Sequence, residues 1–165
     1  MKQSAGLLLY RRQSGDWQVL LAHPGGPFWA KKDAGAWSIP KGEFVEGEEP
    51  QAAARREFQE ELGRAAPEGE LTDLGSSKQS SGKMVYIWAQ TGDFDTAHIA
   101  SNTMKLEWPP RSGTMQDFPE VDRAAWYGFA EARRKLVKGQ VVFIDRLAEH
   151  LGVQETPQPQ QATLF

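Results

Sequence analysis

The chain has 165 residues, with 19 basic and 22 acidic side chains and a formal net charge of −3. Its hydrophobic content of 39% and charged content of 25% are typical of one globular domain of this length. Because the chain has no cysteine, disulfides, thiolate metal sites and a cysteine nucleophile are excluded. No apolar run is long enough for a membrane span, and we expect a cytoplasmic protein.

Two short apolar runs near the start of the chain are separated by polar residues and a glycine. This pattern predicts two neighbouring strands, at 5–10 and 17–23. The polar stretch 76–83 is expected to be flexible. Further short strands are expected at 36–39, 70–74, 84–89, 105–108 and 124–127.

The clearest helix is expected to begin at Pro50 and to end at about Leu62. Proline suits the first helical position, acidic residues precede it near the positive end of the helix dipole, and Gly63 ends the helix. Two more helical patterns lie at 129–136 and 141–151. Strands around a central helix, followed by helices at the end, predict a mixed α/β fold.

The last residues of the chain differ in composition from the rest. Residues 154–165 are rich in glutamine and proline and have no hydrophobic periodicity, so we expect a flexible tail. The folded domain is therefore predicted to cover residues 1–153.

Three glutamates lie on one face of the predicted central helix. Glu57, Glu60 and Glu61 have the spacing i, i+3, i+4, and their mutual repulsion costs roughly 0.2–0.5 kcal/mol per pair. A divalent cation would turn this repulsion into coordination, and carboxylate oxygens suit Mg²⁺ or Mn²⁺. The spacing alone is more often that of a solvated acidic face, because charge runs usually are solvated faces.

Residues 42–64 also follow a longer pattern of fixed spacing. The positions that fit it are Gly42, Glu48, Arg56, Glu57, Phe58, Glu60, Glu61 and Gly63. In this pattern the chain resembles the Nudix hydrolase family. The resemblance implies an α/β/α sandwich with a mixed central sheet. Arg64 departs from the family, which usually has an apolar residue at that position.

The resemblance also implies a metal site and its ligands. In the family, the glutamates that match Glu57, Glu60 and Glu61 bind divalent metal ions, and the glycine that matches Gly42 takes part through its carbonyl oxygen. We therefore expect Mg²⁺, or Mn²⁺, as the cofactor.

Further roles follow from the same resemblance. Glu48 is expected to pair with Arg56 and to brace the site, and Arg56 counts among the catalytic groups. A carboxylate beside the metal can act as the general base, for which Glu60 and Glu61 are the candidates. Glu120 is a reserve candidate from a later loop, although an ordinary loop carboxylate explains it more simply.

The segment before the helix bears on the substrate. Residues 37–42 read Trp-Ser-Ile-Pro-Lys-Gly, which is similar to the branch of the family that acts on dinucleoside polyphosphates and diphosphoinositol polyphosphates. Lys41 would then contact phosphate. The plain alternative is an exposed lysine in a structural turn.

Four aromatic residues are candidates for stacking on a base. Tyr86 and Trp88 share one face of a predicted strand, and such a pair is more often part of the core. Phe28 and Trp29 lie in a loop rich in glycine and lysine, which makes them the better candidates for a substrate loop.

The favoured function is metal-dependent hydrolysis of a nucleoside diphosphate linked to another moiety, with a dinucleoside polyphosphate or a diphosphoinositol polyphosphate as the substrate. The alternatives are sanitation of nucleoside triphosphates, cleavage of a nucleotide sugar or ADP-ribose, and a Nudix domain that senses a nucleotide without cleaving it. The expected partner is a small molecule and not a nucleic acid or a membrane, and the protein is expected to be a monomer or a homodimer.

Overall fold

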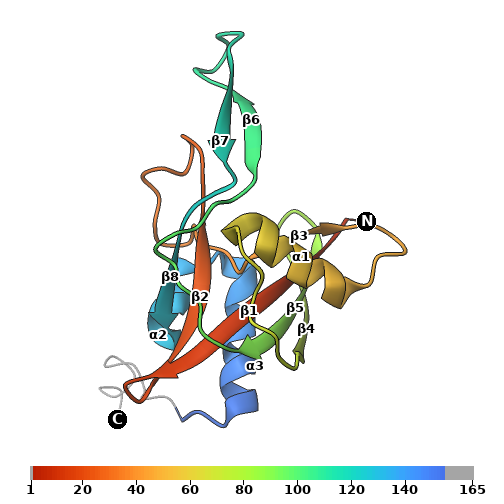
Figure 1. Ribbon diagram of the computed structural model, residues 1–165, viewed down its shortest axis with the longest axis vertical. Coiled ribbons are helices and arrows are strands. Elements are labelled where there is room, and N and C mark those ends of the chain that lie inside the picture. Colours follow the sequence, from red (N-terminus) through yellow and green to blue (C-terminus); the bar gives the residue numbers. More distant parts are fainter. Residues whose placement is uncertain (1, 155–165) are drawn as a thin grey trace.

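A mixed β-sheet runs through the middle of the molecule in the computed structural model, which describes residues 2–154 (Figure 1). Five strands follow the order β4-β5-β1-β2-β8, and β3 also pairs with β1. The β1–β5 pair is parallel, whereas the other pairs are antiparallel. The strands of this sheet are β1 (Gln3–Gln13), β2 (Asp16–Pro24), β3 (Lys41–Phe44), β4 (Thr72–Lys78), β5 (Met84–Thr91) and β8 (Val121–Gly128).

Helices cover both faces of this sheet. Alternate residues of β1 point to opposite sides, so Leu7 and Leu9 lie in one core cluster with Phe58, while Leu8 lies in another with Phe143. The first cluster packs against one helix and the second against the two at the end of the chain. These helices are α1 (Pro50–Leu62), α2 (Phe129–Lys135) and α3 (Val141–Leu151), with a short 3₁₀ turn at Lys138–Gln140. The predicted α/β/α sandwich is confirmed.

A separate two-stranded ribbon projects from the body of the molecule (Figure 1). It consists of β6 (Thr103–Glu107) and β7 (Met115–Pro119), which pair antiparallel. The sequence predicted a strand near β6 but none at β7. This region is rich in polar and turn residues, so β7 shows no clear alternation of apolar and polar residues in the sequence.

The central helix begins and ends as the sequence predicts. Pro50 lies in its first turn, and Gly63 caps its end in a left-handed conformation with φ 87°, donating its N–H to the carbonyl oxygen of Gln59. Glycine adopts this conformation without the steric cost that other residues incur. Helix α1 therefore carries its carboxylates at the positions expected for them.

The strand predicted at 36–39 is wrong. Trp37 and Ile39 are buried, but this stretch makes only isolated bridges, and the chain enters the sheet after Pro40 as β3. The apolar run therefore marked a segment that fills the core and not a strand.

The predicted strand at 70–74 is displaced towards residues expected to be flexible. Residues 76–78 pair with β5, after an irregularity at Gly75, whose φ is 80°. Arg146 of α3 donates to the carbonyl oxygens of Leu74 and Ser76 at 3.0 and 2.8 Å. Polar residues are common in such an edge strand because one face and one edge remain in water.

Within residues 2–154, no helix has the length and apolar character needed to cross a membrane. The predicted tail at 154–165 lies, except for its first residue, outside the described residues.

Candidate active site

Two glycines allow β3 to lie close to its neighbours. A Cβ atom at Gly42 would overlap the carboxylate of Glu57, and one at Gly6 would lie 2.7 Å from the Cβ of Lys41 and from the carbonyl oxygen of Pro40. Contacts this short do not occur between real atoms of these types. The carboxylate of Glu57 therefore lies directly against the backbone of Gly42, in space that any other residue would fill.

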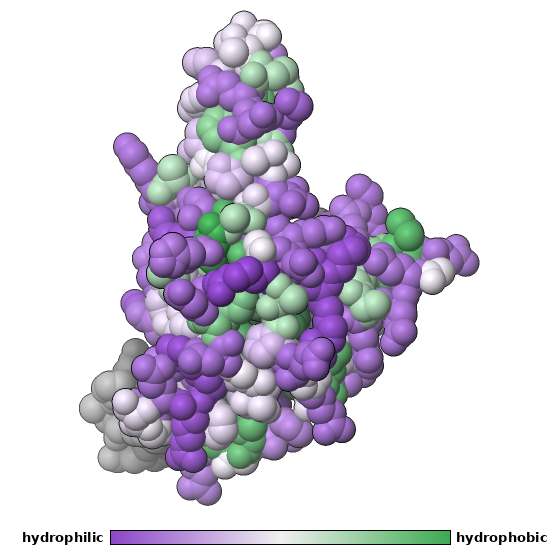
Figure 2. Space-filling view, viewed as in Figure 1, coloured by the Kyte–Doolittle hydropathy of each residue, from purple (hydrophilic) through white to green (hydrophobic). Residues whose placement is uncertain are grey.

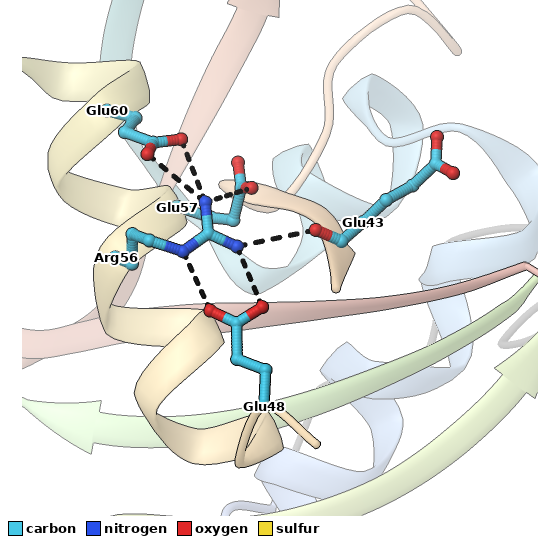
Figure 3. Close-up of polar contacts among 5 residues, drawn as sticks. All are labelled: Glu43, Glu48, Arg56, Glu57 and Glu60. Carbon is cyan, nitrogen blue, oxygen red and sulfur yellow. Dashed lines mark hydrogen bonds and ion pairs between the residues drawn. The ribbon is translucent and has the colours of Figure 1, made fainter. Parts of the chain in front are cut away.

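Arg56 binds several acidic groups at once (Figure 3). Its Nε and Nη2 atoms donate to the two carboxylate oxygens of Glu48 at 2.9 and 3.2 Å. Its Nη1 donates to Glu57 at 2.9 Å and to both carboxylate oxygens of Glu60 at 3.1 Å, and Nη2 also donates to the carbonyl oxygen of Glu43 at 3.4 Å. The guanidinium thus connects the loop before α1 to two of its glutamates.

These contacts shift the acidity of the groups involved. The hydrogen bonds from Arg56 hold the pKa of Glu48 below its ordinary value, and the acidic groups around Arg56 raise the pKa of its guanidinium. A two-point pair of this kind fixes the orientation of both side chains. Arg56 and Glu48 therefore form a charged brace between the loop and the helix.

Glu61 of α1 interacts with Lys41 of β3. Burial raises the pKa of Glu61 to about 8, while Lys41 acts in the opposite direction and Glu57 and Glu120 raise it further. Burial likewise lowers the pKa of Lys41, and the charge of Glu61 partly offsets this effect. Burial also raises the pKa of Glu57, against the influence of Arg56.

Glu120 reaches the site through a chain of backbone hydrogen bonds. The N–H of Asn102 donates to the carbonyl oxygen of Glu60, and the N–H of Glu120 donates to that of Asn102, both at 2.9 Å. The N–H of Gly25 donates to the carbonyl oxygen of Glu120 at 2.9 Å. These long-range bonds place Glu120 where its charge raises the pKa of both Glu57 and Glu61. At the level of sequence, only the family resemblance, which offers a glutamate from a later loop, made Glu120 a reserve candidate.

Among residues 2–154, no group of three or more acidic or histidine side chains is arranged, as it stands, so that it could hold a metal ion. The carboxylates of Glu57 and Glu60 instead accept hydrogen bonds from Arg56. The donor set nevertheless fits a hard cation, because Glu57, Glu61 and Glu120 are carboxylates that repel one another. A divalent cation would relieve this repulsion, with Glu57, Glu60 and Glu61 as the ligands that the sequence predicts.

The aromatic candidates divide into two groups. Trp88 is buried in the core cluster beneath α1, and Tyr86 packs partly buried against the same cluster, where its hydroxyl accepts a hydrogen bond from Gln3. Phe28 and Trp29 remain exposed, at 56% and 38%. The second pair is therefore the more accessible to a ligand.

Most of the chain matches a known domain family. The family model described as NUDIX domain covers residues 1–147. The chain belongs to the NUDIX family. No curated protein sequence is similar enough to this NUDIX chain to count as a match.

Solved structures share the NUDIX fold at low sequence identity. An Ap4A hydrolase from C. elegans, in a binary complex, is 19% identical with a TM-score of 0.65, over 92% of this chain and 98% of that one. The NUDIX domain of Shewanella oneidensis NrtR, complexed with ADP ribose, is 14% identical with a TM-score of 0.62, over 90% and 87% of the two chains. The C-terminal domain of mouse MUTYH, in complex with human PCNA, is 20% identical with a TM-score of 0.57, over 100% and 98%. These likenesses establish the fold.

Proposed function

We propose that this NUDIX protein hydrolyses a phosphoric anhydride in a nucleoside diphosphate linked to another moiety, with the aid of a divalent cation. The observation that carries the proposal is the gathering of Glu57, Glu61 and Glu120 beside Lys41. A cation bound there would neutralise substrate phosphates and lower the pKa of a bound water. Membership of the NUDIX family supports this class of reaction.

Lys41, Arg56 and Gly42 each have a distinct part in this proposal. The ammonium of Lys41 binds a phosphate oxygen, since its positive charge acts on the carboxylate of Glu61 and therefore lies beside the carboxylates. Arg56 positions Glu57 and Glu60 through the contacts described above. Gly42 keeps open the space that the carboxylate of Glu57 occupies.

Three carboxylates can accept the proton of the attacking water, namely Glu60, Glu61 and Glu120. Arg56 donates to both oxygens of Glu60, which leaves that carboxylate less able to accept a proton. We favour Glu61, and Glu120 is the second candidate because it faces the same group of charges from a different segment.

For the substrate we propose a dinucleoside polyphosphate or a diphosphoinositol polyphosphate. The Pro-Lys-Gly sequence before α1 supports this choice, because it places Lys41 next to the carboxylates. A nucleoside triphosphate, a nucleotide sugar or ADP-ribose is the alternative substrate. A NUDIX domain that binds a nucleotide without cleaving it is the alternative that is not an enzyme. A cytoplasmic location and a small-molecule partner remain part of the proposal.

The proposal is tested with a panel of diadenosine tetraphosphate, diphosphoinositol polyphosphate, ADP-ribose and nucleoside triphosphates, each incubated with the protein and Mg²⁺. Phosphorus NMR of the products identifies the bond that is cleaved. We expect turnover that stops when EDTA is added and that falls strongly in Glu61→Gln. If the protein binds one of these compounds tightly but turns over none of them, the hydrolase proposal is wrong and a nucleotide sensor is favoured.

A further inference from the structure

The projecting ribbon has one apolar face. In its register Met104 pairs with Phe118, and Leu106 and Trp108 follow on the same side at alternate positions. The opposite face carries polar residues, including the Lys105–Asp117 ion pair at 3.0 Å. An isolated two-stranded ribbon is at best marginally stable in water, so its apolar face needs a cover.

The loop 25–32 provides that cover. A Cβ atom at Gly26 would lie 3.0 Å from the Met104 side chain and 3.5 Å from that of Leu106, and one at Gly25 would overlap the carbonyl oxygen of Pro119. The loop therefore lies against the ribbon along its length. We call the ribbon 103–119 together with this loop the aromatic arm.

The far end of the loop is anchored in the body of the protein. The ring nitrogens of the fully buried His23 contact the Lys32 carbonyl oxygen at 2.7 Å and the Asp122 carboxylate at 2.9 Å. Asp122 is two residues from Glu120, which hydrogen-bonds to Gly25 through its backbone. The aromatic arm is thus fixed at its base, next to the carboxylates of the candidate active site.

The outer part of the arm presents aromatic rings to solvent. The ring of Phe28 meets that of Trp108 edge to face, with centroids 5.3 Å apart and planes at 84°. Phe28 is nevertheless 56% exposed, and the neighbouring Trp29 lies 5.4 Å from the ammonium of Lys32. The view in Figure 2 shows apolar residues interspersed with hydrophilic ones along this projection.

Such exposure is concentrated in one place. Among the described residues, the large hydrophobic side chains that are exposed are Phe28, Trp29, Val45 and Met115. All but Val45 belong to the aromatic arm. Single exposed apolar residues need no explanation, but a group of exposed rings on a projection whose base adjoins the candidate active site indicates a binding surface.

The position of the Phe28–Trp108 pair limits what it can bind. The backbone N–H of Trp108 donates to the carbonyl oxygen of Thr114 across the ribbon. Trp108 lies five residues beyond Thr103, which pairs with Pro119 at the base of the ribbon. At about 3.3 Å per residue, this pair lies about 17 Å along the arm from the junction that holds Glu120. The base of the nucleotide whose diphosphate is attacked lies too near the carboxylates to reach the Phe28–Trp108 pair. The base of a second nucleoside, at the other end of a phosphate bridge, can reach it.

We propose that Phe28 and Trp108 form the subsite for the distal nucleobase of a dinucleoside polyphosphate whose phosphate bridge lies at Lys41 and the carboxylates. This inference rests on the proposed function and narrows its substrate. The open part of the Phe28 ring stacks on the base, and Trp108 holds that ring from its side. The basic residues Lys31 and Lys32 of the same loop suit a polyanionic ligand.

The test compares Phe28→Ala and Trp108→Ala with the unchanged protein in the hydrolysis of diadenosine tetraphosphate. Loss of one stacking contact should raise KM by about fivefold to a hundredfold with little change in kcat. Phe28→Tyr, which keeps a ring, should retain a KM close to that of the unchanged protein. Met115→Ala is the matched control, because Met115 is equally exposed but lies on the opposite face of the ribbon.

Inorganic tripolyphosphate, which has no base, serves as a competitive inhibitor in the same assays. Its inhibition constant should be the same in all four variants, since it occupies only the phosphate site. An unchanged KM in Phe28→Ala and Trp108→Ala, or an equal loss of tripolyphosphate binding, would overturn the subsite while leaving the hydrolase proposal standing. A dimer in solution that Phe28→Ala dissociates would also overturn it, because the rings would then be an interface between two copies. If the unchanged protein cleaves no nucleotide, the proposed hydrolase function itself is wrong, and this result is distinct from a failure of the subsite alone.

Discussion

The carboxylate site on α1 and the aromatic arm lie next to each other, but different interactions define them. At the carboxylate site, ion pairs and two close backbone approaches fix the side chains from several directions, as with Arg56 and its acidic partners. In the arm, a few apolar contacts hold a ribbon whose outer rings remain exposed. A site that stabilises developing charge requires fixed groups, whereas a surface that selects the substrate tolerates variation. Substitutions should therefore impair chemistry in the first region and substrate preference in the second.

The largest effect is expected for Gly42→Ala. The new methyl group would take the space of the Glu57 carboxylate and displace it from the site. A displacement of about 1 Å at a catalytic group costs roughly a hundredfold in rate, so kcat should fall at least that far while KM changes less. Steady-state kinetics with the substrate found in the panel measures this.

Gly128→Ala is the matched control for Gly42→Ala. Gly128 has φ −62°, and its added Cβ would have the Trp17 carbonyl oxygen at 3.9 Å as its only near contact. This variant should keep the activity of the unchanged protein. An active Gly42→Ala protein would show that the close approach of Glu57 to β3 is not needed.

Arg56→Ala should destabilise the fold in addition to lowering activity. It removes the charged hydrogen bonds to Glu48, Glu57 and Glu60 and leaves these acids to repel one another. We expect a loss of roughly 2 kcal/mol in the free energy of unfolding, measured by urea denaturation. Arg55→Ala is the control, because Arg55 makes one exposed hydrogen bond, to the Gly69 carbonyl oxygen. Equal losses in both variants would contradict the brace.

Lys41→Ala should act on substrate binding more than on chemistry. Removal of a charged contact to phosphate should raise KM for diadenosine tetraphosphate by about tenfold, and by less for ADP-ribose, which has fewer phosphates. Lys83→Ala is a useful comparison, because Lys83 also lies near Lys41 but pairs with Glu43 at 3.5 Å. An equal rise in KM for both substrates in Lys41→Ala would contradict the choice of polyphosphate.

A separate effect, on stability and not on catalysis, is the pH dependence of the free energy of unfolding in the absence of metal. The pKa of Glu61 is raised from 4.5 in its ordinary state to about 8 in the folded protein. The folded state therefore binds a proton that the unfolded state has released, and the contribution of Glu61 to stability decreases as pH rises from 4.5 to 8. In EDTA, urea midpoints of the unchanged protein should fall relative to those of Glu61→Gln across this range. A constant difference between the two would contradict a raised pKa.

The sequence was most informative where local rules decide the structure. Pro50 and Gly63 define the limits of α1, and the glutamate spacing requires them to share a face, so this element could be predicted almost to the residue. Strand β3 escaped prediction because its four residues include a lysine, a glycine and a glutamate, and only the room beside Gly6 admits them to the sheet. The contribution of Glu120 depends on backbone bonds between segments far apart in the chain, which no local pattern encodes. The apolar face of the ribbon is likewise covered by a loop far away in the sequence, at 25–32, which no local pattern predicts.

The most direct test of the central claim is a calorimetric titration of the protein with Mn²⁺ at pH 7. The unchanged protein should bind Mn²⁺, and the double variant Glu57→Gln/Glu61→Gln should lose this binding, while Glu46→Gln in the loop before α1 should keep it. Equal affinity of the double variant and the unchanged protein would contradict a cation site at these carboxylates.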